Sequence, residues 1–198
     1  MQSLISYNAL VQRVDEFIER TVRKYASYIS CRIGCSLCCE CSFGVFPVEA
    51  WAVKVWLWEK EEREREKILE QLGSPSGKTC PALMEKKCLI YPARPILCRT
   101  QGLPVLKPRK RGTFELSFCK ENFRVSGSPI RIEGQFILNL DNLNAALATV
   151  NEGFRREWSS LGRGELPERV KVTHFLEGLA SEKSEEARQD IDQMGRFW

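Results

Sequence analysis

Five of the nine cysteines lie in one eleven-residue stretch, CRIGCSLCCEC, at residues 31–41. The other four follow in a proline-rich segment: Cys80, Cys88, Cys98 and Cys119. Thiolates are the preferred ligands of zinc and of iron–sulfur clusters, and either centre usually takes four of them. A close-packed thiol group answered by a second group further along the chain is a strong metal signal. The two groups therefore predict a metal site that draws ligands from both.

The spacing within the first group leaves the number of centres open. Cys35 and Cys38 are two residues apart, so a tight turn lets both sulfurs point at one ion. Cys38 and Cys39 are adjacent, and extended backbone sends neighbouring side chains to opposite sides. One of these two thiols is therefore expected to serve a second metal, a cluster edge or a packing role. One centre with reserve thiols and two separate centres both remain open.

The second cysteine group carries a more specific pattern, CPALMEKKCLIYPARPILCR, at residues 80–99. With the preceding C-x3-C-x2-CC block, it resembles the zinc- or iron-chelating cysteine-cluster family, also called CxxCxxCC or YkgJ-like. The resemblance covers roughly residues 31–100. The matching positions are Cys31, Gly34, Cys35, Cys38, Cys39, Cys80, Pro81, Leu83, Cys88, Ile90, Tyr91, Arg94, Pro95, Cys98 and Arg99.

The resemblance implies metal chelation. Larger relatives of the family, the flagellin lysine methylases, connect the pattern to an iron–sulfur cluster. This chain departs from the family pattern at an extra thiol, Cys41, at Lys87, where a glycine is frequent, and at TQGLP after the final Cys-Arg pair. None of these departures falls on an expected ligand position.

We therefore predict an all-cysteine metal site that holds an iron–sulfur cluster or zinc. The iron–sulfur cluster is preferred because the thiols outnumber the ligands of one zinc ion and because of the family resemblance. Cys41 is the expected spare thiol. The predicted ligands are Cys31, Cys35, Cys38, Cys39, Cys80, Cys88, Cys98 and Cys119.

Two arginines flank Cys98 and are expected to support the site. Four thiolates around zinc or an oxidised four-iron cluster leave a net negative charge. Arg94 and Arg99 could offset that charge, hydrogen-bond to sulfur and lower the thiol pKa, and the matched Tyr91 is placed beside them. The alternative is that these arginines are surface residues or salt-bridge partners.

Three other interpretations of the cysteines are weaker. The spacing of residues 31–38 also occurs in radical S-adenosylmethionine enzymes, but Leu37 stands where an aromatic usually precedes their third cysteine, and the chain lacks their series of βα units. A redox dithiol normally follows a strand, whereas a helix is predicted here. An odd number of cysteines cannot form a closed disulfide set.

The first elements that must carry these cysteines are predicted to be helices. One of these helices is expected to run from Pro47, a first-turn proline, to about Leu72, before Gly73. Its charged second half, EKEEREREK, is predicted to leave the core for solvent. An N-terminal helix over residues 4–29 follows from an apolar stripe at three- and four-residue steps: Val11, Val14, Ile18, Val22, Tyr25 and Ile29.

Beyond Gly73 the pattern changes twice. GSPSGKT, at residues 73–79, is predicted to be a loop. Residues 80–138 are predicted to be irregular, with short strands at 88–91, 113–118 and 130–138. The helical period then returns, which predicts a helix at 140–161. Pro167 is expected to open a helix at 167–180, and a polar helix is expected at 182–194.

The predicted fold class is mainly α, with helices around an irregular cysteine-rich metal-binding centre and a few short strands. A length of 198 residues suits a single domain. Within it we expect a cysteine-cluster core at about residues 31–120, a helical N-terminal arm at 1–30 and C-terminal helices at 139–198.

Composition narrows the partners. A net charge of +4 with 28% charged residues does not demand a polyanionic partner. The most apolar window, FGVFPVEAWAVKVWLW, is too short and too polar to cross a bilayer, and the N-terminus lacks signal-peptide features. We therefore expect a cytoplasmic protein without a membrane partner. The basic run KPRKR at 107–111 is interpreted as a solvated loop, so no nucleic-acid partner is expected, and the single histidine, His174, is not expected to be a ligand.

Two functional classes follow from the sequence. One is a metal-binding module with an electron-transfer, delivery or structural role. The other is an enzyme whose cluster takes part in group transfer, such as protein methylation. Catalytic residues cannot be assigned, because no serine–histidine–acid set or phosphate loop stands out.

Overall fold

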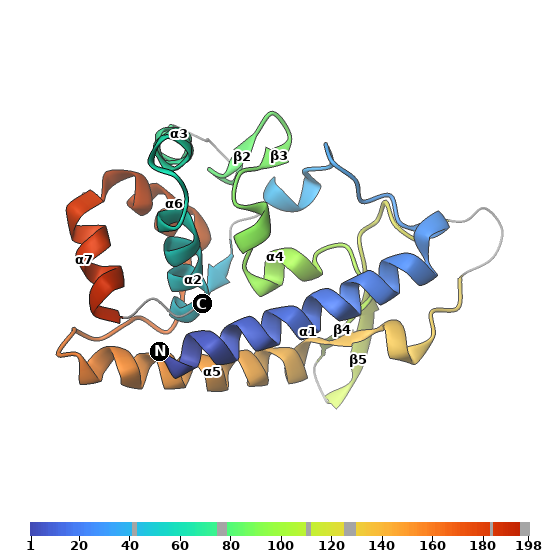
Figure 1. Ribbon diagram of the computed structural model, residues 1–198. Coiled ribbons are helices and arrows are strands. Elements are labelled where there is room, and N and C mark those ends of the chain that lie inside the picture. The colour runs from blue at the N-terminus through green and yellow to red at the C-terminus, as the bar shows by residue number, and fades with distance from the viewer. Residues whose placement is uncertain (41–42, 75–78, 110–111, 125–129, 183, 195–198) are drawn as a thin grey trace.

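The structure is a computed structural model that describes residues 1–40, 43–74, 79–109, 112–124, 130–182 and 184–194. Within these residues it contains seven α-helices and seven short strands, joined by 3-10 turns and irregular segments (Figure 1). The predicted fold class, mainly α around a cysteine-rich segment with a few short strands, is confirmed.

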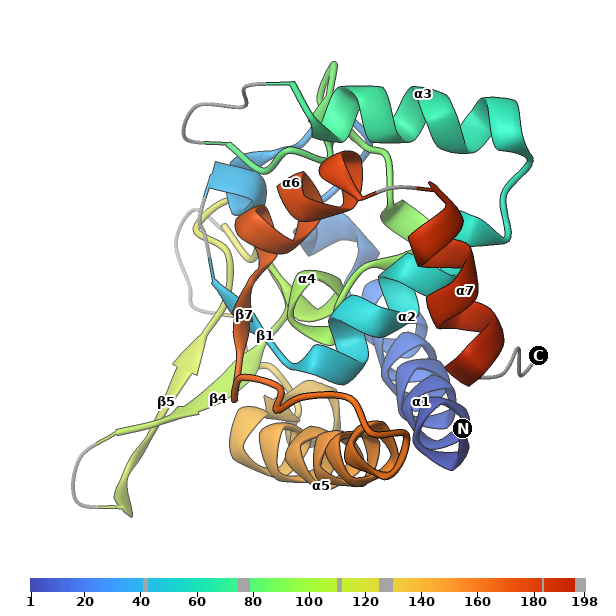
Figure 2. The same ribbon diagram turned by 90° about the vertical axis from the view of Figure 1, so that its left-hand side faces the viewer.

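Two long helices form the base of the molecule. Helix α1 (Gln2–Lys24) and helix α5 (Leu140–Ser160) lie side by side, as Figures 1 and 2 show. Both helices were predicted, although α1 ends earlier than expected and a 3-10 turn follows it. They share a hydrophobic core in which Phe154 is 1% exposed. Asn139 accepts hydrogen bonds from two backbone N–H groups at the start of α5, which fixes where that helix begins.

The single long helix predicted from Pro47 to Leu72 is wrong. The chain forms α2 (Pro47–Trp58) and α3 (Glu62–Leu72), separated by a turn. Nine of the twelve residues of α2 are buried, whereas α3 buries only Ile68 and Leu72. The turn swings α3 across α6 (Val172–Ser181), where those two side chains enter a second core cluster (Figure 2). The charged half therefore packs through one face instead of leaving for solvent.

The C-terminal helices follow the predicted pattern with one shift. Helix α7 (Ser184–Met194) is confirmed. Helix α6 begins five residues after the proline expected to open it, because β7 (Val170–Lys171) first pairs antiparallel with β1 (Gly44–Val45). This two-stranded pairing joins the segment that follows the first cysteines to the C-terminal helices.

The segment expected to be irregular contains more regular structure than predicted. It includes β2 (Leu83–Met84), β3 (Lys87–Cys88), α4 (Ile96–Thr100), β4 (Val105–Pro108), β5 (Phe114–Ser117) and β6 (Leu138–Asn139). The strand predicted at 113–118 is confirmed as β5. The strands predicted at 88–91 and 130–138 are wrong apart from their overlaps with β3 and β6, because a 3-10 turn takes Tyr91–Ala93 and another takes Gly134–Phe136.

Strand β4 lies between β5 and β6 and forms with β5 a hairpin that projects from the body (Figure 2). The described part of the basic run lies on this hairpin, where Arg109 forms an ion pair with Glu115. The loop predicted at 73–79 falls largely outside the described residues. Across the part of the chain that is described, no helix is both long and apolar enough to span a bilayer.

Candidate metal centre

The two cysteine groups meet where the segment that leads into α2 lies beside the segment that follows α3. The backbone N–H of Cys80 donates a hydrogen bond of 2.8 Å to the carbonyl oxygen of Cys39. Figure 1 shows the 3-10 turn η2 (Leu37–Glu40) beside the β2–β3 hairpin and α4. Residues separated by two helices in the sequence are therefore neighbours in space, as the split cysteine pattern required.

One set of thiols gathers around this contact, and we call it the inner thiol group: Cys39, Cys80, Cys88 and Cys98. Cys39 lies on η2, Cys80 just before β2, Cys88 on β3 and Cys98 within α4. Pairing of Leu83 with Cys88 turns the hairpin so that Cys88 returns toward Cys80. The positions thus come from four different backbone elements.

The electrostatics of the inner thiol group confirm that its members are close. Negative charge on Cys80, Cys88 and Cys98 opposes ionisation of Cys39. Burial, with smaller contributions from neighbouring thiols, raises the pKa of Cys88 to about 11 and that of Cys98 still further. Cys80, Cys88 and Cys98 resist ionisation chiefly because they are buried, so a positive charge among them would favour the loss of their protons.

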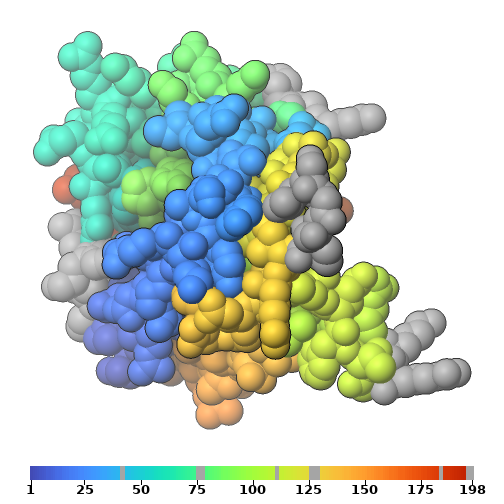
Figure 3. Space-filling model, turned by 90° about the vertical axis from the view of Figure 1, so that its right-hand side faces the viewer, coloured from blue at the N-terminus to red at the C-terminus, as the bar shows by residue number. Residues whose placement is uncertain are grey.

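A second set of thiols lies where the chain leaves α1, and we call it the outer thiol group: Cys31, Cys35 and Cys119. Burial raises the pKa of Cys31, and the charges of Cys35, Cys119 and Cys38 add to the effect. The segment around residue 120 lies against the residues that follow α1, as Figure 3 shows on one face of the molecule. The backbone N–H of Phe123 donates to the Tyr28 carbonyl oxygen at 2.6 Å and fixes this contact.

Cys38 lies between the two groups. Its thiol hydrogen-bonds with Cys39, and this contact raises the pKa of Cys38 while it lowers that of Cys39. Charge on Cys38 also opposes ionisation of Cys31 on one side and of Cys80 and Cys88 on the other. Cys41, the expected spare, lies outside the described residues.

The donor set fits a thiophilic centre. All eight described cysteines are free thiols, and the two groups are composed of sulfur donors throughout. Among the described residues, no three ligating side chains already stand at metal-ligand geometry. His174 is exposed on α6. Such a sulfur set suits zinc or an iron–sulfur cluster, and the thiols would bind either one after losing their protons.

Arg94 and Arg99 differ in their relation to the thiols. The positive charge of Arg94 favours ionisation of Cys38, Cys88 and Cys98, which is the direction expected for a group that offsets thiolate charge. The Arg94 guanidinium also stacks on the Tyr91 ring, 3.5 Å from its centroid, and this contact holds it over the loop.

Arg99 instead fastens the loop to helix α1. Its Nη1 lies 2.8 Å from Asp15 Oδ2, and its Nε donates to the Arg94 carbonyl oxygen at 2.8 Å. A further N–H group donates to the Pro92 carbonyl oxygen. In the structure Arg99 is thus a salt-bridge partner, the alternative considered from sequence, and it holds Arg94 and α4 in place.

Glu49 is a supporting residue that sequence reasoning missed. Its carboxylate is 2% exposed, and its two oxygens accept from Phe46 N and Ile96 N, both at 2.9 Å. One carboxylate therefore caps α2 and also the first turn of α4, which carries Cys98. Burial raises the pKa of Glu49, while the two N–H donors oppose that shift. A Pro-x-Glu start to α2 was the available signal, but it did not indicate a second helix.

Asn122 plays the same role for the outer thiol group. It is 1% exposed, accepts from Ser30 N at 2.9 Å and donates to Gly102 O at 2.7 Å. Its Nδ2 also lies 3.4 Å from Cys31 Sγ. Gly102 adopts φ +86°, and a Cβ at this position would lie 3.0 Å from Cys31 Sγ, so glycine is required there. Nothing in the sequence marked either residue.

These features place two groups of free thiols on a helical frame, a donor set that suits a metal. Comparison with known proteins agrees: residues 30–120 match the family model CxxCxxCC, described as a putative zinc- or iron-chelating domain. The match confirms the resemblance drawn from the two cysteine blocks and extends it to Cys119. No curated protein and no solved structure matches the chain significantly.

Proposed function

We propose that this protein is a metal-binding module that holds its metal through the thiolates of residues 31–119, in an electron-transfer, delivery or structural role. The supporting observation is the convergence of the inner thiol group. The Cys39 carbonyl oxygen accepts a hydrogen bond from Cys80 N–H, and the charges of the three other thiols act on the Cys39 thiol. The match of residues 30–120 to the family model of a putative zinc- or iron-chelating domain supports the same proposal.

The chain's own residues account for how such a site would form. Binding replaces thiol protons with a cation, so the metal would offset the burial, and the smaller repulsion between thiolates, that raise the pKa of Cys88 and Cys98. Arg94 offsets part of the remaining negative charge, and Glu49 holds the helix that presents Cys98. The predicted ligands remain Cys31, Cys35, Cys38, Cys39, Cys80, Cys88, Cys98 and Cys119.

An iron–sulfur cluster is the preferred occupant, and zinc is the alternative. Eight described thiols exceed the four that one zinc ion takes. All of them are free, which suits a reducing compartment, and we place the protein in the cytoplasm on that ground.

Anaerobic purification followed by elemental analysis and a visible spectrum tests the proposal. A brown protein with iron and acid-labile sulfide is the expected result. Colourless protein with stoichiometric zinc would replace the iron–sulfur assignment but keep the metal-binding one. Protein that carries neither metal and takes up neither one on reconstitution would overturn the proposed function.

Group transfer, the second function expected from the sequence, has no structural observation in its favour among the described residues. Its test is separate. Binding of S-adenosylmethionine to the purified, metal-loaded protein, measured by calorimetry, would establish it as a methylation candidate, and the metal-binding module predicts no such binding.

A further inference from the structure

We propose that strand β5 is a docking edge for a second copy of this chain. Two copies would pair their β5 strands antiparallel, with Leu116 of each on the two-fold axis. The edge belongs to the β4–β5 hairpin, which projects from the body with β5 on its outer side (Figure 2). This inference concerns assembly and does not depend on the proposed metal-binding function.

One side of the β5 backbone is left without a neighbouring strand. Arg109 N–H donates to the Thr113 carbonyl oxygen at 2.8 Å, and the β4–β5 register continues from this bonded pair. Because bonded and non-bonded pairs alternate along an antiparallel ladder, the N–H and C=O groups of Glu115 face β4, while those of Phe114 and Leu116 face away. Within the described part of the chain, no strand lies on that side of β5.

The opposite edge of the hairpin cannot take a strand in the same way. Leu106 of β4 is paired with Asn139 of β6, and Pro108, further along β4, has no N–H group to donate. Strand β5 contains neither proline nor lysine, which commonly protect exposed sheet edges. Of the two outer edges of the hairpin, β5 is therefore the one that can accept another strand.

The same strand presents an apolar face to solvent. Phe114 and Leu116 on β5 and Phe118 just after it alternate along the chain, so they share one face of the hairpin, and they are 53%, 41% and 40% exposed. Leu106 and Pro108 of β4 lie opposite Leu116 and Phe114 and extend this face. Neighbouring exposed apolar side chains of this kind mark an interaction surface.

The sequence of β5 is complementary to itself in one register. Antiparallel pairing about Leu116 places Phe114 of each copy opposite Phe118 of the other and joins the two apolar faces. Glu115 then lies opposite Ser117. Pairing about Glu115 would also match the outward backbone groups, but it would set two carboxylates directly opposite each other, which is destabilising. Charge therefore selects the register centred on Leu116.

The basic groups of the hairpin are compatible with this pairing. Lys107 lies on β4 and Arg109 directly follows it, so both are one strand away from the joined edge, and Arg109 already forms an ion pair with Glu115 of its own copy. Pairing would therefore not bring the cations of two copies together. Because each copy contributes one short strand, the contact is small, and we expect a reversible dimer.

Analytical ultracentrifugation of the reduced full-length protein across the micromolar range tests the assignment. The wild type should show a monomer–dimer equilibrium that depends on concentration. Leu116→Pro should remain a monomer, because it removes an outward N–H group at the axis and no bond to β4. Leu116→Lys should also remain a monomer, because it places two like charges at the axis and keeps the backbone unchanged. Leu161→Lys, at a residue that is 48% exposed elsewhere, is the matched control and should still dimerise.

The register has a test of its own. Ser117→Lys should tighten the dimer about fivefold, because the new ammonium group lies opposite Glu115 of the other copy, and Ser117→Glu should weaken it by a similar factor. Both effects should shrink at high salt concentration. Pairing about Glu115 would instead place residue 117 opposite Thr113, so neither substitution would change the dissociation constant.

Each outcome supports or overturns the inference. A wild type that stays monomeric at every concentration would overturn a second copy as the occupant of this edge. A dimer that persists in both Leu116→Pro and Leu116→Lys would place the interface elsewhere, and circular dichroism establishes that both variants are folded. An unchanged dissociation constant in both Ser117 variants would overturn the register. Metal uptake is measured separately, so none of these results bears on the proposed function.

Discussion

The helical frame and the cysteine segment are stabilised by different means. The frame, formed by α1, α2 and α5, buries large side chains such as Phe154, which is 1% exposed. In residues 30–40, by contrast, no side chain is buried, and Ile33 is 86% exposed. Burial of apolar area holds the frame, whereas residues 30–40 bury no side chain and, on the proposed function, would gain their order from metal. The frame should therefore survive treatments that disorder the segment.

Metal removal should give the largest difference between the two regions. Binding energy of a structural thiolate centre is folding energy, about 10 kcal/mol in small zinc domains, so its loss should disorder residues 30–40, which bury no side chain. Hydrogen exchange measured by mass spectrometry should show loss of protection there, with α1 and α5 still protected. Equal protection of both regions after complete chelation would contradict the comparison.

Phe154→Ala should have the opposite selectivity. Removal of this fully buried ring from the frame should lower the free energy of unfolding by about 3–5 kcal/mol, because a cavity remains in the core. Metal content per folded chain should not change. Leu161→Ala, at a residue that is 48% exposed, is the matched control and should change stability by less than about 0.5 kcal/mol.

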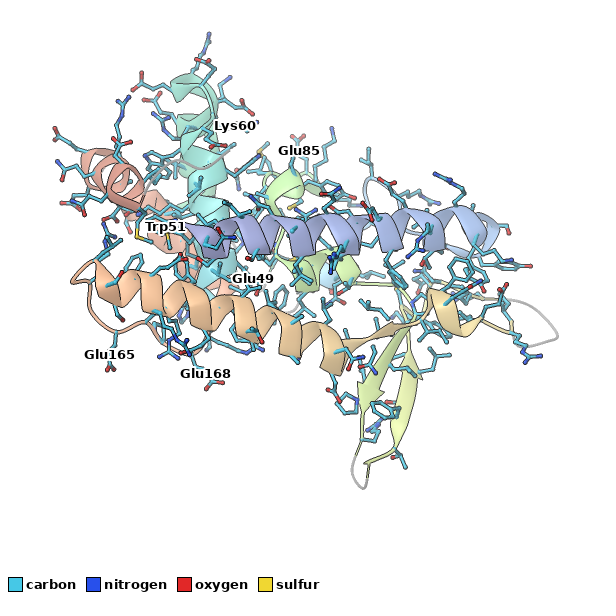
Figure 4. All side chains as sticks on the ribbon, turned by 60° about the horizontal axis from the view of Figure 1, so that its bottom comes forward. Glu49, Trp51, Lys60, Glu85, Glu165 and Glu168 are labelled. Carbon is cyan, nitrogen blue, oxygen red and sulfur yellow. The ribbon has the colours of Figure 1, made fainter. Side chains whose placement is uncertain are left out.

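Glu49→Gln should affect both regions, because this carboxylate connects them. The amide keeps one acceptor oxygen, so either Phe46 N or Ile96 N loses its partner, at a cost of about 2 kcal/mol. Chemical denaturation should report that loss, and Co²⁺ titration should report weaker binding at the inner thiol group. Glu165→Gln, on an exposed loop (Figure 4), is the control and should alter neither measurement.

Alkaline pH should destabilise the metal-free protein through the inner thiol group. Burial raises the pKa of Cys88 from 9.0 to about 11, so its stabilising effect is complete below pH 9 and is lost as pH rises toward 11. The full loss from this thiol should be about 3 kcal/mol, since the shift is about two pKa units and each is worth about 1.4 kcal/mol.

Urea unfolding of the reduced apoprotein at several pH values measures this effect. Cys88→Ser should show a flatter decline over the same range. A metal-free wild type that becomes more stable between pH 9 and pH 11 would contradict the burial of this thiol.

Asp15→Asn should produce the smallest of these effects. It weakens the ion pair that fastens Arg99 to α1, and the carboxylate is 40% exposed, so we expect a loss of about 1 kcal/mol. Faster release of Co²⁺ from the inner thiol group to a chelator should accompany this loss of stability. Glu19→Gln, exposed on the same helix, should leave both stability and release unchanged.

Sequence predicted the parts of the molecule that have a local signal. The periodic stripes predicted α1 and α5, and the spacing of the cysteines indicated that two distant groups would meet, as the Cys39–Cys80 contact confirms. The ligand assignment itself stays a prediction.

The parts that sequence did not predict depend on tertiary contacts. No glycine or proline marks the break between α2 and α3, because burial of Ile68 and Leu72 against α6 produces it. The role of Asn122 depends on a contact with Ser30, more than ninety residues away in the chain. Residue types alone carry no record of such a contact.

The position of Glu49 has a consequence for the time at which a newly made chain can acquire metal. Helix α4 has only five residues, too few to persist alone, and its first N–H group is held by a carboxylate on α2. Cys98 can therefore take its place only after α2 has entered the core of the frame. We therefore expect metal capture by the inner thiol group to be a late step of maturation. A chain whose frame is misassembled would then not withhold metal from correctly folded copies.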